Sequence, residues 1–167
     1  MTEQLSPLAL QALAIVEESG AIISANHAHP HTIRHKGRID LVTETDIAVE
    51  AFLKERLATL TPEAGFLAEE SAEDLSLPDT CWIIDPVDGT TNFAHGLPLT
   101  VTSVAYRLNG EIVLGIVNAP LLRECFIAEK GKGAWRNGER ISVSSVADCE
   151  NALVSTGFPY ENRPPRG

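Results

Sequence analysis

The stretch WIIDPVDGTTNF, residues 82–93, decides how the rest of this chain is organised. It continues an apolar run, residues 81–84, that is typical of a buried strand. Two carboxylates, Asp85 and Asp88, follow that run, so we expect both of them at one end of a sheet. Pro86 stands between them, and its fixed φ and missing N–H predict a rigid turn there.

The residues after the carboxylates favour an anion site. Gly89 can adopt positive φ or let backbone approach a ligand closely, and Thr90 and Thr91 suit the first turn of a helix. The free N–H groups and positive dipole end of a helix favour phosphate. Hard oxygen ligands beside such a helix start predict a Mg²⁺ site that handles a phosphate. The alternative is a simple turn, because Asp-Pro-x-Asp-Gly is also good turn chemistry.

Two observations favour the active-site interpretation. The carboxylates directly follow a run that is too apolar for a surface edge strand. A second acidic pair, Glu69-Glu70, ends another strand-like run at residues 65–68. Two strands that both end in carboxylates are a better match to a metal site than to a lone turn.

With these motifs the chain resembles the inositol monophosphatase family of Mg²⁺-dependent, lithium-sensitive phosphomonoesterases. The resemblance rests on AEES at residues 68–71 and on the stretch 82–93, and KGRIDLVTETD at 36–46 and GFPY at 157–160 also fit. It implies an α+β fold: the α-β-α-β-α layering of sugar phosphatases, of which residues 1–167 would form the first α-β part as one domain. The family's second-half Trp-Asp-x-Ala-Ala motif has no counterpart, since neither Trp82 nor Trp135 precedes an aspartate. We therefore expect a truncated chain.

The resemblance also implies roles for individual residues. Glu69, Asp85 and the Val87 carbonyl would hold one Mg²⁺, and Asp85 with Asp88 a second. Glu69 and the Thr90 hydroxyl would orient the attacking water. The substrate-binding residues would be Glu69, Val87, Asp88, Gly89, Thr90 and Lys36, with the Gly89 and Thr90 N–H groups on the phosphate.

Composition narrows the classes of partner. The 167 residues are 44% hydrophobic, enough for one well-cored domain. A net charge of -10 argues against nucleic acid and anionic membranes as direct partners. Three cysteines without metal-ligand spacing suggest reduced thiols and a cytoplasmic location. We see no signal peptide and expect no run of membrane-spanning length. A homodimer is expected for the full-length protein.

The N-terminal part predicts two helices, over residues 5–25 and 43–60, packed on the sheet. Ser6-Pro7 suits the start of the first. The second has apolar residues assigned to its buried face: Ile47, Val49, Phe52, Leu53 and Leu57. Thr43 and Asp46 resemble a capping box, which would be a purely structural role for Asp46. The functional interpretation counts Asp46 among the catalytic residues, beside the metals and hydrogen-bonded to Thr90, and the two roles are compatible.

Two features between these helices have both structural and functional interpretations. His27, His29, His31 and His35 alternate through a loop without cysteine or acidic partners, so a solvated linker is favoured over a zinc site. Lys36 alone would be a surface lysine, whereas the family pattern places it near the phosphate.

The remainder predicts an antiparallel meander that serves as scaffold. Alternating runs at residues 100–108 and 111–117 flank Asn109-Gly110, a strong hairpin signal. A further strand is expected at 124–129, a tight turn at Asn137-Gly138, and a last short strand at 154–156.

Two functions from different classes follow. The first is hydrolysis of inositol monophosphate or a similar small phosphorylated alcohol by metal-activated water, with histidinol phosphate and nucleoside bisphosphates as related substrates. The second is a non-catalytic Mg²⁺-binding fragment. Because half of the two-metal clamp would be missing, we expect residues 1–167 alone to be a poor phosphatase that self-associates.

Overall fold

The computed structural model describes residues 5–27, 33–35, 41–71 and 77–156. Its elements follow one another in the order α1 (Pro7–Asn26), β1 (Ile33–His35), β2 (Leu41–Thr43), α2 (Glu44–Ala58), β3 (Gly65–Ala68), β4 (Cys81–Asp88), α3 (Thr90–Ala94), β5 (Val101–Leu108), β6 (Glu111–Ala119), β7 (Glu124–Glu129), β8 (Gly133–Arg136) and β9 (Glu139–Ile141).

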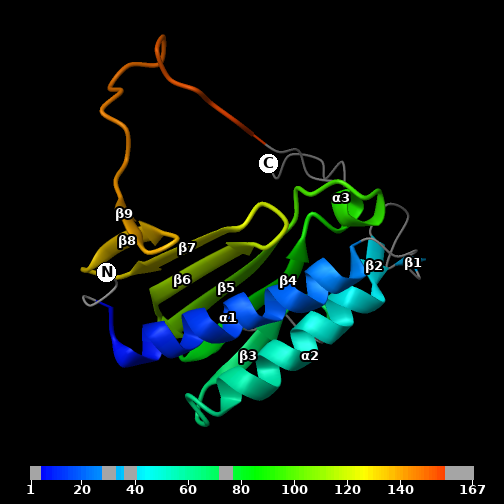
Figure 1. Cartoon of the computed structure of the whole chain (residues 1–167). Helices are drawn as coiled ribbons and strands as arrows, with labels where there is room; N and C mark the ends of the chain where they lie inside the picture. Colours follow the sequence, from blue (N-terminus) through cyan, green and yellow to red (C-terminus); the bar gives the residue numbers. More distant parts are fainter. Residues whose placement is uncertain (1–4, 28–32, 36–40, 72–76, 157–167) are drawn as a thin grey trace, which may run out of the picture.

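Within the described residues, the main sheet has seven strands in sequential order from β3 to β9. Of these seven, only β3 and β4 run parallel, and every later neighbour is antiparallel. The two long helices, α1 and α2, lie side by side on one face of this sheet (Figure 1). β1 and β2 form a separate antiparallel pair. The predicted α+β fold, with two helices on a mostly antiparallel sheet, is confirmed.

The core lies between the sheet and the two helices. One row of paired residues crosses four strands on the helix side: Val104, Ile116, Ile127 and Trp135, all at most 3% exposed. The helices contribute fully buried residues to the same core: Val16, Ile23, Leu53 and Leu57. Because strand residues alternate between faces, the neighbouring row lies on the opposite face, and it consists of small residues: Ala105, Gly115, Ala128 and Ala134.

Helix α1 begins as predicted. The Ser6 side chain accepts the Ala9 N–H, and Pro7 occupies the first helical position. With 20 residues, α1 is long and apolar enough to span a membrane by length and composition, so the expectation that no run reaches that length was wrong. Its Ala12, Val16 and Ile23 are nevertheless fully buried, which is how the core helix of a globular domain packs.

Helix α2 begins with the predicted capping box. The Thr43 side chain accepts the Asp46 backbone N–H, and the Asp46 side chain accepts the Thr43 backbone N–H. Val49, Leu53 and Leu57 are buried as expected, but Ile47 is 49% exposed, so its assignment to the buried face was wrong. The buried side of α2 follows Asp46, Val49, Glu50 and Leu53, and Ile47 falls outside that 3.6-residue period.

The meander confirms both predicted tight turns. Asn109-Gly110 and Asn137-Gly138 each have positive φ at both residues, which type I′ hairpin turns require. The strand predicted at residues 154–156 was wrong, because this segment has no strand structure. Residues 142–156 extend away from the sheet without helix or strand (Figure 1), so none of the described strands pairs with 154–156.

Candidate active site

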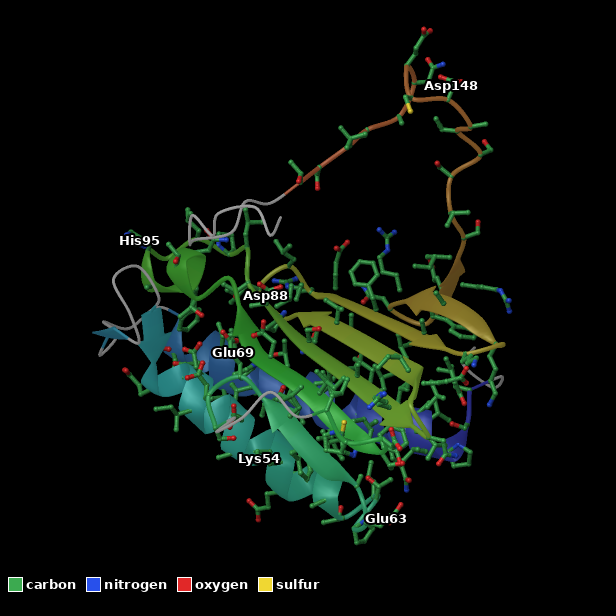
Figure 2. All side chains as sticks on the ribbon, turned by 180° about the vertical axis from the view of Figure 1, so that it is seen from behind. Lys54, Glu63, Glu69, Asp88, His95 and Asp148 are labelled. Carbon is green, nitrogen blue, oxygen red and sulfur yellow. The ribbon has the colours of Figure 1, made fainter. Side chains whose placement is uncertain are left out.

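The parallel pairing of β3 and β4 brings the acidic residues together. Ala68 at the end of β3 is paired with Ile84 of β4. The next residue on each strand is therefore an acid, Glu69 beside Asp85, and the Glu69 N–H donates to the Ile84 carbonyl at 3.1 Å. Figure 2 shows Glu69 and Asp88 near the same end of the sheet. The expected convergence of the two acidic motifs thus follows from a single strand pairing.

The segment after Asp85 differs from the predicted turn. β4 continues through Pro86 to Asp88, and its register with β5 shifts between Asp85 and Asp88. The Pro86 carbonyl accepts the buried Thr102 hydroxyl at 2.9 Å, which anchors this irregularity to β5. Pro86 supplies no N–H to the ladder, so a register shift is the expected way for a strand to pass it.

Gly89 is the residue at which the strand becomes a helix. It has φ 94°, the first of the two roles expected for this glycine, and it is the N-cap of α3. A Cβ at this position would lie 2.8 Å from the Leu99 carbonyl oxygen. Thr90 is the first residue of α3, as predicted.

Asp46 lies at the other side of the site and contacts Thr90. Its Oδ1 is 3.1 Å from Thr90 Oγ1. Its Oδ2 accepts the Thr43 N–H at 2.9 Å and the Thr43 hydroxyl at 2.5 Å. The capping role and the contact to Thr90 therefore coexist in one buried carboxylate.

Asp85 is the electrostatic centre of the cluster. Burial, followed by the charge and hydrogen bond of Glu69 and the charges of Asp88 and Asp46, raises the pKa of Asp85 to about 8. Desolvation and like charges both disfavour the ionised carboxylate. A bound cation would reverse both effects.

The described residues fit part of a Mg²⁺ site. Asp85 Oδ1 is buried and has no hydrogen-bond partner, an expensive state for a carboxylate oxygen. Carboxylate and carbonyl oxygens are the donors that Mg²⁺ prefers. Within the part of the chain that the structure describes, however, no three acidic, histidine or cysteine side chains are grouped closely enough to hold an ion. These oxygens are of the chemical type that Mg²⁺ prefers, but the described side chains do not surround a common point where the ion could sit.

One buried acid, which bonds to the segment just after Glu69, was not anticipated from the sequence. Glu50 of α2 is only 4% exposed, and its Oε2 accepts the Glu70 N–H at 2.8 Å. The available signal was its spacing, because Glu50 lies four residues after Asp46 and four before Lys54 on one side of α2.

The structure brings most of the predicted site residues to one end of the sheet. Asp46, Glu69 and Asp88 are close enough for their charges to act on Asp85. The Val87 carbonyl is 2.9 Å from Thr90 Oγ1. Lys36 lies outside the described residues, as do His29 and His31.

Comparison with known proteins gives a consistent picture. The sequence model described as the inositol monophosphatase family matches residues 4–166. An inositol monophosphatase of Dictyostelium discoideum is 44% identical over 154 residues, which cover 90% of this chain and 57% of that protein.

Two solved structures are similar to most of this chain. One is the IMPase of Thermotoga maritima, with a TM-score of 0.74 and 38% identity over 80% of this chain and 52% of that one. The other is an IMPase/NADP phosphatase complexed with Mg²⁺ and phosphate, with a TM-score of 0.68 and 28% identity over 76% of this chain and 49% of that one. The chain therefore spans about half the length of the relatives that it matches.

Proposed function

The chain belongs to the inositol monophosphatase family, and from this premise we propose that it supplies carboxylate metal ligands of a Mg²⁺-dependent phosphomonoesterase site. The observation that carries the proposal is Asp85, whose buried, unpartnered oxygen lies beside Glu69 at the end of two parallel strands. A similar protein has been solved with Mg²⁺ and phosphate, which supports this donor chemistry. The substrate class would be small phosphorylated alcohols, with inositol monophosphate as the first candidate.

Glu69, Asp85, Asp88 and the Val87 carbonyl would hold the metal. When bound, Mg²⁺ would supply Lewis acidity and lower the pKa of a coordinated water. The chain's own residues would orient the reactants. Thr90 Oγ1 has one proton, which it can donate to Asp46 Oδ1 at 3.1 Å or to the Val87 carbonyl at 2.9 Å. In either case its lone pairs stay free to accept a hydrogen bond from the attacking water.

The start of α3 would bind the phosphate. The positive φ of Gly89, the N-cap residue, turns the backbone so that α3 begins at Thr90, two residues after Asp88. The first N–H groups of a helix have no intrahelical acceptor, so those of Gly89 and Thr90 would be available to phosphate oxygens. Lys36 is proposed as a further phosphate contact from the sequence pattern alone.

The test is Mg²⁺-dependent release of phosphate from a panel of monoesters: inositol monophosphate, histidinol phosphate and a nucleoside bisphosphate. It would be run on residues 1–167 and on a chimera in which this chain precedes the second half of the Dictyostelium relative. We expect hydrolysis that EDTA abolishes, at least in the chimera. A folded chimera that binds Mn²⁺ but hydrolyses none of the esters would contradict the proposal and favour the non-catalytic alternative.

A further inference from the structure

The end of β3 is held from two sides. Successive N–H groups along a strand point to opposite sides. The Glu69 N–H points to β4 and donates to the Ile84 carbonyl at 3.1 Å. The Glu70 N–H points the other way, and β3 is the first strand of the sheet, so no strand of the described chain lies there to accept it.

The acceptor for Glu70 is a buried acid on the neighbouring helix. Glu50 Oε2 accepts the Glu70 N–H at 2.8 Å, and the Glu50 side chain is 6% exposed. A buried carboxylate is costly unless it is hydrogen-bonded or paired. Lys54 Nζ lies 4.0 Å from Glu50 Oε1, and the same Nζ donates to the Ser71 hydroxyl at 2.9 Å.

One side of α2 therefore contacts both the start of α3 and the residues that follow β3. Asp46, Glu50 and Lys54 recur every four residues, a spacing that stacks side chains along one side of a helix. Asp46 contacts Thr90 at the start of α3, and Glu50 and Lys54 contact the residues directly after Glu69. Figure 2 shows Lys54 and Glu69 in the part of the molecule where α2 and β3 lie.

We propose that Glu50 is a positioning residue for the metal site: its carboxylate fixes the Glu70 N–H, and so the direction in which Glu69 presents its own carboxylate. This inference rests on the proposed function. Groups that orient a metal ligand without touching the ion typically change metal affinity by about 10- to 100-fold when they are removed.

Two conservative variants separate the effect of side-chain length at position 50 from the effect of its negative charge. Glu50→Gln loses the charge but keeps an oxygen at the same distance from the Glu70 N–H. Glu50→Asp keeps the charge but is one methylene too short to reach it. The matched control is Glu55→Gln, a loss of charge at an exposed position of the same helix.

The measurement is the dissociation constant for Mn²⁺, followed by its electron paramagnetic resonance signal on residues 1–167. We expect Glu50→Gln and Glu55→Gln within about threefold of the parent and Glu50→Asp weaker by about tenfold. If Glu50→Asp binds like the parent, or if Glu50→Gln is the weaker of the two, the inference is overturned.

A second measurement keeps this test separate from the proposed function. Hydrogen exchange of the Glu70 amide in the metal-free protein should be slow in the parent and in Glu50→Gln, and faster in Glu50→Asp. Equal protection in all three proteins overturns the inference. Failure of the parent to bind Mn²⁺ counts against the proposed function, and the exchange data then decide the inference alone.

Discussion

Thr90 Oγ1 lies 3.1 Å from Asp46 Oδ1, although the two residues are 44 positions apart in the chain. Each is in the first turn of a helix, Asp46 in α2 and Thr90 in α3. The second oxygen of Asp46 is already engaged by Thr43, so the carboxylate is fixed in rotation. The Thr90 hydroxyl can donate its one proton to this fixed carboxylate or to the Val87 carbonyl, and in either case its lone pairs can accept a hydrogen bond from a water.

Thr90→Ala should therefore impair the chemical step more than binding. Removing one positioning contact for a nucleophile costs about 10²-fold in rate. We expect kcat for phosphate release to fall by about that factor and KM to stay within about threefold. The assay uses residues 1–167 or the chimera, whichever hydrolyses the ester. Thr90→Ser should recover most of kcat, because it keeps the hydroxyl.

The control for Thr90 is the next residue, Thr91, whose side chain is exposed. Thr91→Ala should leave both constants unchanged. A Thr90→Ala variant with unchanged kcat and raised KM would assign Thr90 to phosphate binding instead of water positioning.

Asp85→Asn should abolish metal binding and leave the metal-free fold intact or more stable. The carboxylate of Asp85 is disfavoured by burial and by Glu69, Asp88 and Asp46, and the amide removes that repulsion. With Mg²⁺ at 100 times its dissociation constant, the parent should gain about 2.7 kcal/mol of unfolding free energy. The variant should gain none, as measured by urea unfolding with Mg²⁺ or EDTA.

Asp79→Asn is a suitable control, because Asp79 is an exposed aspartate whose 3.8 Å ion pair with Arg107 lies on the surface. It should keep the full Mg²⁺ response. An Asp85→Asn protein that is still stabilised by Mg²⁺ would show that the metal is held elsewhere.

The raised pKa of Asp85 predicts opposite pH dependences for folding and for metal binding. The ordinary value is 3.8 and the folded value is about 8. The folded state therefore holds the proton more tightly, so the contribution of Asp85 to stability is complete below pH 4 and is lost as pH rises to 8. Urea titrations of the metal-free protein, compared with those of Asp85→Asn, should show that loss only in the parent.

Metal binding should strengthen over the same interval. Below pH 8 the ion must displace a proton from Asp85, and one displaced proton makes the affinity rise by about tenfold per pH unit. Calorimetry in two buffers of different ionisation enthalpy would count the released protons. A Mn²⁺ affinity that does not change between pH 6 and 8 would contradict the raised pKa.

Local signals explain why much of this fold could be predicted. The Asn-Gly turns need φ > 0 at both residues, and few other dipeptides provide it, so both hairpins were predictable. The apolar run before Asp85 and the acids after residue 68 were enough to predict that the two motifs converge. The parallel pairing of Ala68 with Ile84, which places Glu69 beside Asp85, is a long-range contact that no local pattern encodes.

The wrong predictions for Ile47 and for residues 154–156 also arose because a local pattern does not encode long-range contacts. Ile47 was assigned to the core because it is apolar, yet the buried side of α2 contains two acids, Asp46 and Glu50, which accept hydrogen bonds from the Thr90 hydroxyl and the Glu70 N–H. Charged residues are seldom buried unless they are paired, so a hydrophobic pattern overlooks such positions. Residues 154–156 have β-branched character but no adjacent strand in the described part of the chain, and propensity alone does not form a sheet.

Gly89→Ala should lower the unfolding free energy more than Gly96→Ala does. It combines a φ of 94° with a Cβ that would lie 2.8 Å from the Leu99 carbonyl oxygen. Gly96 is the matched control, since its φ of 72° is also positive but a Cβ there would meet nothing within 4 Å. Left-handed backbone costs a non-glycine residue about 1–2 kcal/mol, so Gly96→Ala should lose about that much unfolding free energy.

Gly89→Ala should lose clearly more than Gly96→Ala, because relieving the overlap with Leu99 must move α3 or the backbone that follows it. Since α3 starts at Thr90, any such shift also moves the Thr90 hydroxyl relative to Asp46. Urea unfolding gives the free energies, and phosphate release by the catalytically competent form gives kcat. Equal losses of stability for the two variants, with kcat unchanged in Gly89→Ala, would show that the close approach at Gly89 constrains neither the fold nor the site.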